Sequence, residues 1–234
     1  MEFVPTNFPL FEGRSDFDYF GRLIPAKKVG GDLIDIFLLN DKQLFLSISD
    51  TLGKGIPASI YAARTKFFIR NIANPVTRLG EIMESLNDSL CLESTSDMFA
   101  TVFMGKLDLD TGKLIYCNSG HPQPLILRNN NREEVLIQSH GIPVGLKLNL
   151  KFAESSTILA PGESLIIYTD GVTEQCDEKG EYFATERLIG IVSQFRDLSA
   201  QDIVNKTLDV LKRFRGITEV HDDIALAALK FFGK

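Results

Sequence analysis

The 234-residue sequence predicts an α+β fold built on one or two antiparallel β-sheets. Several runs of apolar, β-favouring residues are separated by tight turns, and tight turns join antiparallel rather than parallel strands. Segments with helical spacing interrupt these runs at two places. The apolar content of 44% and charged content of 24% are those of an ordinary globular chain. We therefore expect a single domain over residues 1–234, with residues 1–16 as a lead-in segment.

The first half of the chain predicts a β-hairpin followed by two helices. Apolar residues alternate along both arms of the hairpin, which meet at the turn "NDKQ". A glycine-containing loop then leads to Pro57, which suits the first turn of a helix because no N–H is needed there. Asn74-Pro75 separates this helix from the next. The expected elements are strands 30–39 and 44–50 and helices 58–71 and 76–92.

The second half predicts mostly strands, then two helices and a closing strand. The second of these helices begins with a capping box, because Ser199 is followed three residues later by Asp202. Ile203, Leu208 and Leu211 then recur at helical spacing. The expected strands are 99–108, 113–120, short runs on either side of 128–132, then 151–160, 164–170 and 223–231.

Composition excludes several functional classes. A net charge of −6 argues against a nucleic-acid-binding surface, which would carry an excess of basic residues. Three scattered cysteines and three histidines supply a zinc or copper site poorly. No run approaches the roughly 18 apolar residues of a membrane span, and the first residues lack a signal-peptide pattern. We therefore expect a cytoplasmic protein with no membrane and no nucleic-acid partner.

Acidic residues stand at the ends of four predicted strands. Asp32 follows Gly30-Gly31 at the head of one strand, and Asp50 ends the next. Asp170 follows the run "SLIIYT" and precedes Gly171, whereas Asp222 and Asp223 precede the last strand. Each acid alone is more often a turn former than a ligand. If the four ends met, their mutual repulsion would require cations, and oxygen donors without His or Cys favour Mg²⁺ or Mn²⁺.

At these acids the sequence resembles the metal-dependent protein phosphatases, the PPM or type 2C superfamily, and most closely their bacterial SpoIIE/RsbU-type branch. The resemblance extends from about Phe17 to Lys230 and follows the order of the family's motifs. Each block alone is weak, and their shared order makes the resemblance strong. The blocks are "AKKVGGDLID", "SISDTLGKGIPASI", "FATVFMGKLDLDTGKLIYCNSGHPQPLIL", "PVGL", "LAPGESLIIYTDGVTE" and "HDDIALAAL".

This resemblance implies a sandwich of two antiparallel β-sheets flanked by helical layers, with two Mn²⁺ or Mg²⁺ ions at one edge. The implied catalytic, metal-binding acids are Asp32, Asp50, Asp170 and Asp222, joined by the backbone carbonyl of Thr51. Asp222 is preferred to Asp223 because relatives often have Asn after the ligand. The chain departs from the usual pattern at Leu33, Ile34, Thr51 and Leu52.

Further residues are implied as supporting or substrate-contacting groups. Asp35 is expected to act on the metals from outside the ligand set or through water, and Gly171 and Asp223 adjoin the ligands. Lys54 is either a phosphate-attracting residue or, more commonly for a loop lysine, a solvated one. His121 is interpreted as a structural hydrogen-bonding residue at a turn. Ile60 and the Phe67-Phe68 pair are expected in the core, on helices that the resemblance also associates with regulating metal binding or pairing protomers.

The function implied by resemblance is hydrolysis of phosphoserine or phosphothreonine on another protein by a water that two metals activate. A phosphorylated anti-sigma-factor antagonist of the STAS type, in a bacterial partner-switching pathway, is the first candidate substrate. An upstream sensor or activator and a homodimer are expected as partners. A catalytically silent, phosphatase-like binding module is the alternative, and a phosphodiesterase or nuclease built from the same acids is a third hypothesis.

Overall fold

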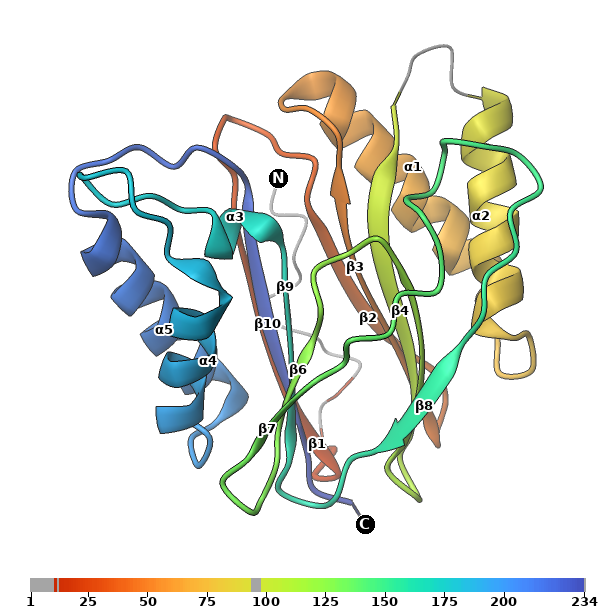
Figure 1. Ribbon diagram of the computed structural model, residues 1–234. Coiled ribbons are helices and arrows are strands. Elements are labelled where there is room, and N and C mark those ends of the chain that lie inside the picture. Colours follow the sequence, from red (N-terminus) through yellow and green to blue (C-terminus); the bar gives the residue numbers. More distant parts are fainter. Residues whose placement is uncertain (1–10, 12, 94–97, 234) are drawn as a thin grey trace.

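Two five-stranded antiparallel sheets lie face to face, with helices on their outer sides (Figure 1). This computed structural model describes residues 11, 13–93 and 98–233. The predicted α+β sandwich with flanking helices is confirmed. The lead-in segment expected at residues 1–16 falls largely outside the described residues.

The strand order is β1-β10-β9-β6-β7 in the first sheet and β2-β3-β4-β5-β8 in the second. Hairpins form most of the second sheet, so neighbouring strands there are mostly neighbours in sequence. The strands are β1 (Phe17–Ile24), β2 (Leu33–Asn40), β3 (Gln43–Thr51), β4 (Ala100–Asp108), β5 (Lys113–Ser119), β6 (Leu125–Leu127), β7 (Glu133–Val135), β8 (Ser155–Ile158), β9 (Ser164–Tyr168) and β10 (Ile224–Phe231).

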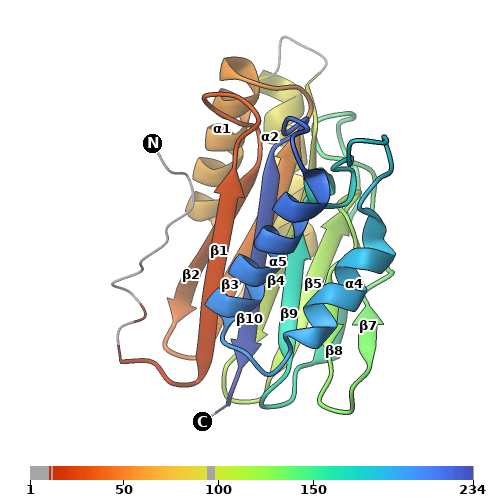
Figure 2. The ribbon, with the colours of Figure 1, turned by 90° about the vertical axis from the view of Figure 1, so that its left-hand side faces the viewer.

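Each sheet carries its own pair of helices. α1 (Ile56–Ile72) and α2 (Leu79–Glu93) pack on the second sheet, and α4 (Ala184–Gln194) and α5 (Ala200–Arg215) pack on the first. Figure 2 shows α4 and α5 lying across the outer face of the sheet that contains β1 and β10. The one-turn helix α3 (Asp170–Thr173) follows β9 directly.

Alternating side chains of the strands separate three apolar layers. In β10, Ala225, Ala227 and Leu229 face the other sheet, whereas Leu226 and Ala228 face α4 and α5. A period of two along a strand places successive side chains on opposite faces, so both faces of this strand are apolar because both are covered. The sandwich therefore positions its strand ends rigidly, and the candidate site lies at those ends.

Two differences from the predicted elements have clear causes. β1 was not among the expected strands, and its central Gly21 interrupts an otherwise alternating apolar run. The second helix begins at Leu79 rather than Val76 because the Asn74 side chain accepts hydrogen bonds from the N–H groups of Val76 and Thr77 and holds a turn there. The carboxylate of Glu154, distant in sequence, then accepts the N–H of Leu79.

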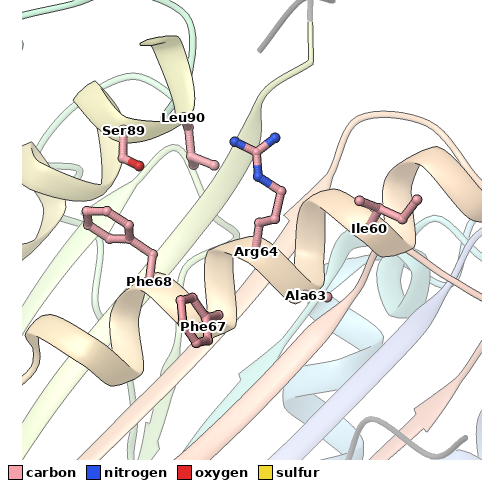
Figure 3. Close-up of a pocket in the computed structure, with 7 residues that line it drawn as sticks. All are labelled: Ile60, Ala63, Arg64, Phe67, Phe68, Ser89 and Leu90. Carbon is pink, nitrogen blue, oxygen red and sulfur yellow. The ribbon is translucent and has the colours of Figure 1, made fainter. Parts of the chain in front are cut away.

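The outer face of α1 is more exposed than the sequence suggested. The Ile60 and Phe67 side chains, expected in the core, are 56% and 72% exposed. With Phe68 and Leu90 they line a groove of about 400 Å³ between α1 and α2 (Figure 3). The helix buries its opposite face instead, through residues such as Tyr61 and Ile69.

Candidate metal centre

Antiparallel pairing brings the predicted acids to one end of the sandwich. β2 begins where β3 ends, so Asp32 and Asp50 lie beside each other. β10 likewise begins where β9 ends, which brings Asp222 and Asp223 close to Asp170. Hydrogen bonds cross between the sheets at this end: the Thr169 hydroxyl donates to Asp32 at 2.7 Å, and the Gly31 N–H donates to Asp223 at 2.6 Å. Residues far apart in sequence therefore form one acidic corner.

The carboxylates of this corner oppose one another's ionisation. Burial and the neighbouring Asp50 raise the pKa of Asp32 well above its ordinary value, and the hydrogen bond from Thr169 opposes this shift. Burial, then the charge of Asp170, raises the pKa of Asp50 to about 7. Burial, then the charges of Glu174 and Asp222, also raises the pKa of Asp170. Acids that raise one another's pKa in this way gain from a nearby cation.

Asp223 holds the segments of the corner together through its carboxylate. Its two carboxylate oxygens accept the N–H groups of Ala26 and Gly31, at 2.7 and 2.6 Å, and the residue is buried. A side chain at Gly30 would collide with this carboxylate, because a Cβ there would lie 2.2 Å from Oδ2. A Cβ at Gly171 would lie 1.9 Å from the Asp223 carbonyl oxygen. Both glycines are therefore required by close packing around Asp223.

The backbone carbonyl of Thr51, an expected ligand, lies at the end of β3 beside Gly31. A Cβ on Gly31 would be 3.1 Å from this carbonyl oxygen, so the glycine leaves that side of the oxygen uncovered. The Thr51 hydroxyl is buried and finds no hydrogen-bond partner among the described residues. The bulk that Thr51 adds therefore points into the protein.

Asp222 differs from Asp223 in exposure and in partners. Its side chain is 44% exposed, and Oδ2 lies 3.1 Å from the Lys54 ammonium group. Its Oδ1 accepts the N–H of Asp223 at 2.9 Å. Lys54 is therefore neither a fully solvated lysine nor free for an anion, because it pairs with an acid of the corner.

Asp35 lies away from the corner, contrary to the expectation that it supports the metals. It is on the face of β2 that α1 covers, and the Arg70 side chain donates to both of its oxygens at 2.5 and 2.6 Å. The Lys66 ammonium group lies 3.6 Å from the same carboxylate. The residue is three positions from Asp32 in a strand, so its side chain points to the opposite face. Asp35 fastens α1 to the sheet.

Two residues of the corner were absent from the expected set. The Thr169 hydroxyl accepts the N–H of Ala225 at 2.9 Å and donates to Asp32, so it fixes Asp32 relative to β10. The charge of Glu174, directly after α3, adds to burial in raising the pKa of Asp170. For Thr169, the signal in the sequence was a hydroxyl residue between an apolar strand and Asp170, in "YTDG".

A small pocket adjoins the acids. It has a volume of about 220 Å³, and Gly171 and Asp222 form the side that touches the corner. Glu174, Cys176 and Tyr182 line the rest, and the Tyr182 side chain is 60% exposed. Asp222 is thus in contact with this pocket next to α3.

The donor set of the corner fits hard divalent cations. It contains carboxylate and carbonyl oxygens, the ligands that Mg²⁺ and Mn²⁺ prefer. Within the described part of the chain, no three Asp, Glu, His or Cys side chains already stand together as a complete ligand cluster. The partly exposed Asp50, Asp170 and Asp222 are the members that solvent already reaches. The raised pKa values of Asp32, Asp50 and Asp170 show that ionising these carboxylates is unfavourable here, and a bound cation would offset that cost.

Comparison with known proteins defines the class. Residues 40–232 match the family model described as stage II sporulation protein E (SpoIIE). This chain belongs to that family, and the branch expected from the motifs is confirmed.

Individual relatives agree with this assignment. The chain is 29% identical to Protein IcfG of Synechocystis sp., over 81% of this chain and 33% of that protein. It is 23% identical to the phosphoserine phosphatase RsbU of Bacillus subtilis, over 88% of this chain and 61% of RsbU. The chain thus spans about one third to three fifths of the length of these curated relatives.

Solved structures share the fold. The RsbU and RsbW domains of Rv1364c from Mycobacterium tuberculosis superpose with a TM-score of 0.81 at 23% identity, over 93% of this chain and 60% of that one. The catalytic domain of the serine/threonine protein phosphatase PstP, in complex with two manganese ions, superposes with a TM-score of 0.66 at 10% identity, over 92% of this chain and 98% of that one.

No described helix is both long and apolar enough to cross a membrane.

Proposed function

We propose that this chain is a metal-dependent serine/threonine protein phosphatase that hydrolyses phosphoserine or phosphothreonine on a partner protein. The observation that carries this proposal is the acidic corner: Asp32, Asp50, Asp170 and Asp222 come from four separate segments and lie at one end of the sandwich. Burial and neighbouring acids raise the pKa of Asp32, Asp50 and Asp170 there. Membership of the SpoIIE family and similarity to a relative named a phosphoserine phosphatase support the same reaction.

Five groups of this chain would hold the metals: the carboxylates of Asp32, Asp50, Asp170 and Asp222, and the carbonyl of Thr51. Two Mn²⁺ or Mg²⁺ ions bound there would lower the pKa of a water and offset negative charge on the phosphoryl oxygens. Thr169 would orient Asp32, since its hydroxyl donates to that carboxylate. Asp223, with Gly30 and Gly171 packed against it, would keep the two halves of the site in register.

The substrate would reach the corner through the pocket next to α3. His121 cannot serve as a proton donor from its position, because it is buried and its Nδ1 is 2.9 Å from the Thr101 hydroxyl. Burial lowers the pKa of His121 to about 3, so the imidazole is neutral at physiological pH. No side chain of this chain is assigned as the donor to the leaving group, which leaves that proton to water.

The proposed physiological substrate is a phosphorylated anti-sigma-factor antagonist of the STAS type, in a bacterial partner-switching pathway. The relatives RsbU and RsbP, both named phosphoserine phosphatases, support this context. An upstream sensor or activator and a second copy of the chain are the proposed partners. The exposed apolar face of α1, with Ile60 and Phe67, supports a partner surface there.

Turnover with and without metal tests this proposal. We expect the purified protein to hydrolyse an aryl phosphate and a phosphoserine peptide with Mn²⁺ present, and to lose this activity with a chelator. Asp170→Asn should lower kcat by at least about 100-fold, since it removes a charged ligand. Asp209→Asn, a change on the exposed face of α5, is the matched control and should retain activity. Absence of turnover at saturating Mn²⁺ would instead favour the silent binding module.

A further inference from the structure

Lys54 makes a contact for which the proposed reaction has no use. It lies in the loop between β3 and α1, and its ammonium group is 3.1 Å from Oδ2 of Asp222. The same group donates a hydrogen bond to the backbone carbonyl of His221. Lys54 lies four residues after Asp50, which is at the end of a strand of one sheet, and Asp222 precedes a strand of the other sheet. Their ion pair therefore joins the two sheets at the acidic corner.

Both oxygens of Asp222 are thereby engaged. Oδ1 accepts the N–H of Asp223 at 2.9 Å, which is a local backbone contact, and Oδ2 pairs with Lys54. The Asp222 carboxylate is an acceptor with a second lone pair on each oxygen, but a divalent cation beside Oδ2 would lie next to an ammonium of the same sign. The ion and Lys54 therefore compete for one oxygen.

The backbone next to Lys54 has open space on its outer side. A Cβ added at either flanking residue, Gly53 or Gly55, would meet no atom within 4 Å. The Lys54 side chain itself is 33% exposed. The backbone is held on both sides of Lys54, because the Leu52 N–H donates to the Phe99 carbonyl and the Gly55 carbonyl accepts the Ser59 N–H. The two contacts to His221 and Asp222 place the ammonium group itself in the corner, and a change of side-chain rotamer takes it out.

We propose that Lys54 is the resident counter-cation of Asp222 and that a divalent ion must displace it to use this carboxylate. This inference rests on the proposed function, since it takes Asp222 as a ligand. Lys54 thus lowers the metal affinity of this chain and is a positioning residue for the site rather than a ligand.

The test is a calorimetric titration of metal-free protein with Mn²⁺. We expect Lys54→Met to bind Mn²⁺ on the order of two- to fivefold more tightly than wild type, the range that loss of one partly exposed ion pair corresponds to. Lys54→Gln keeps a polar group but no charge, and it should behave in the same way. Lys27→Met is the matched control, because Lys27 is exposed and adjoins Ala26, whose N–H binds Asp223. It should leave the affinity unchanged.

The outcomes separate this inference from the proposed function. If wild type and both Lys54 variants bind Mn²⁺ equally, the pairing of Lys54 with Asp222 has no bearing on metal affinity and the inference fails alone. If Lys27→Met tightens Mn²⁺ binding as much as Lys54→Met does, removal of any nearby positive charge explains the result and the inference fails. If wild type binds no Mn²⁺, the proposed function fails and the inference with it.

Discussion

Single residues make the acidic corner possible by giving each carboxylate a defined partner. Thr169 donates to Asp32, and backbone N–H groups of Ala26 and Gly31 donate to Asp223. Even so, burial and neighbouring acids raise the pKa values of Asp32, Asp50 and Asp170. A buried carboxylate without enough donors is costly. These three carboxylates are therefore the ones that a cation would stabilise most.

His121 gives a pH dependence of stability with a defined sign. Burial lowers its pKa from 6.5 to about 3 in the folded protein, so the unfolded chain binds the proton more readily below pH 6.5. Stability that is fully present above pH 6.5 is then lost as the pH falls toward 3, by about 2 kcal/mol at pH 5. Urea unfolding at pH 7 and pH 5 measures this loss, and in His121→Gln the part due to this residue should vanish. Equal losses in the two proteins would contradict the burial of a neutral imidazole.

At this scale the sequence pointed to the four acids and to Asp223 and Gly171 beside them, but not to Thr169 or to the contacts that these groups make. Asp32, Asp50, Asp170 and Asp222 stood at the ends of predicted strands, and Asp32 and Asp170 stood directly beside glycines. The role of Thr169 depends on β9 and β10 being neighbours, and that of Asp223 on the loop before β2 reaching across the sandwich. Asp35 was misplaced because it shared a motif with Asp32, although the strand period sends it to the other face.

The helix α1 is fastened to the second sheet by a buried ion pair rather than by apolar packing alone. Arg70 donates to both oxygens of Asp35, and its guanidinium lies 4.0 Å from the centre of the Phe37 ring. Asp35 is 1% exposed, so it depends on this partner for its charge. Arg70 lies in the last turn of α1, whereas the first turn of the helix follows the loop that carries Lys54.

Removing Arg70 should therefore be costly. We expect Arg70→Met to lower the free energy of unfolding by about 3 kcal/mol, because it leaves Asp35 buried with its main partner gone. Lys66→Met is the matched control: its ammonium group lies 3.6 Å from the same carboxylate, and the change should cost less than about 1 kcal/mol. Urea unfolding of the three proteins measures both effects. Similar losses in the two variants would show that the short Arg70 contact has no special weight.

Most elements could be predicted because their signals are local. The alternation of β2 and β3, Pro57 at the start of α1 and Ser199 at the start of α5 all lie within their own segments, and the Ser199 side chain does accept the N–H of Asp202. The first turn of α2 could not be placed, since Glu154 of a distant loop binds its N–H groups. β1 was missed because it gains its place by pairing with β10, at the opposite end of the chain.

At the scale of the whole molecule, the antiparallel pairing of strands brings the acids of the candidate site together. β2 begins beside the end of β3, and β10 begins beside the end of β9, so acids from the beginning, middle and end of the chain lie at one end of the sandwich. The spacing of the acids along the sequence does not show that they meet in space, and the family resemblance implied that they do. What the fold adds is rigidity, because each strand that carries an acid is buried on both faces. Oxygen ligands on rigid strand ends suit cations that demand regular geometry.

Counting bound metal tests the central claim most directly. After equilibrium dialysis against Mn²⁺, we expect about two ions per wild-type chain, the number of a two-metal site. Asp50→Asn should retain fewer than one, and Asp209→Asn, outside the corner, should retain both. A wild-type chain that binds no Mn²⁺, or an Asp50→Asn variant that still holds two ions, would contradict a metal centre built from these four strand ends.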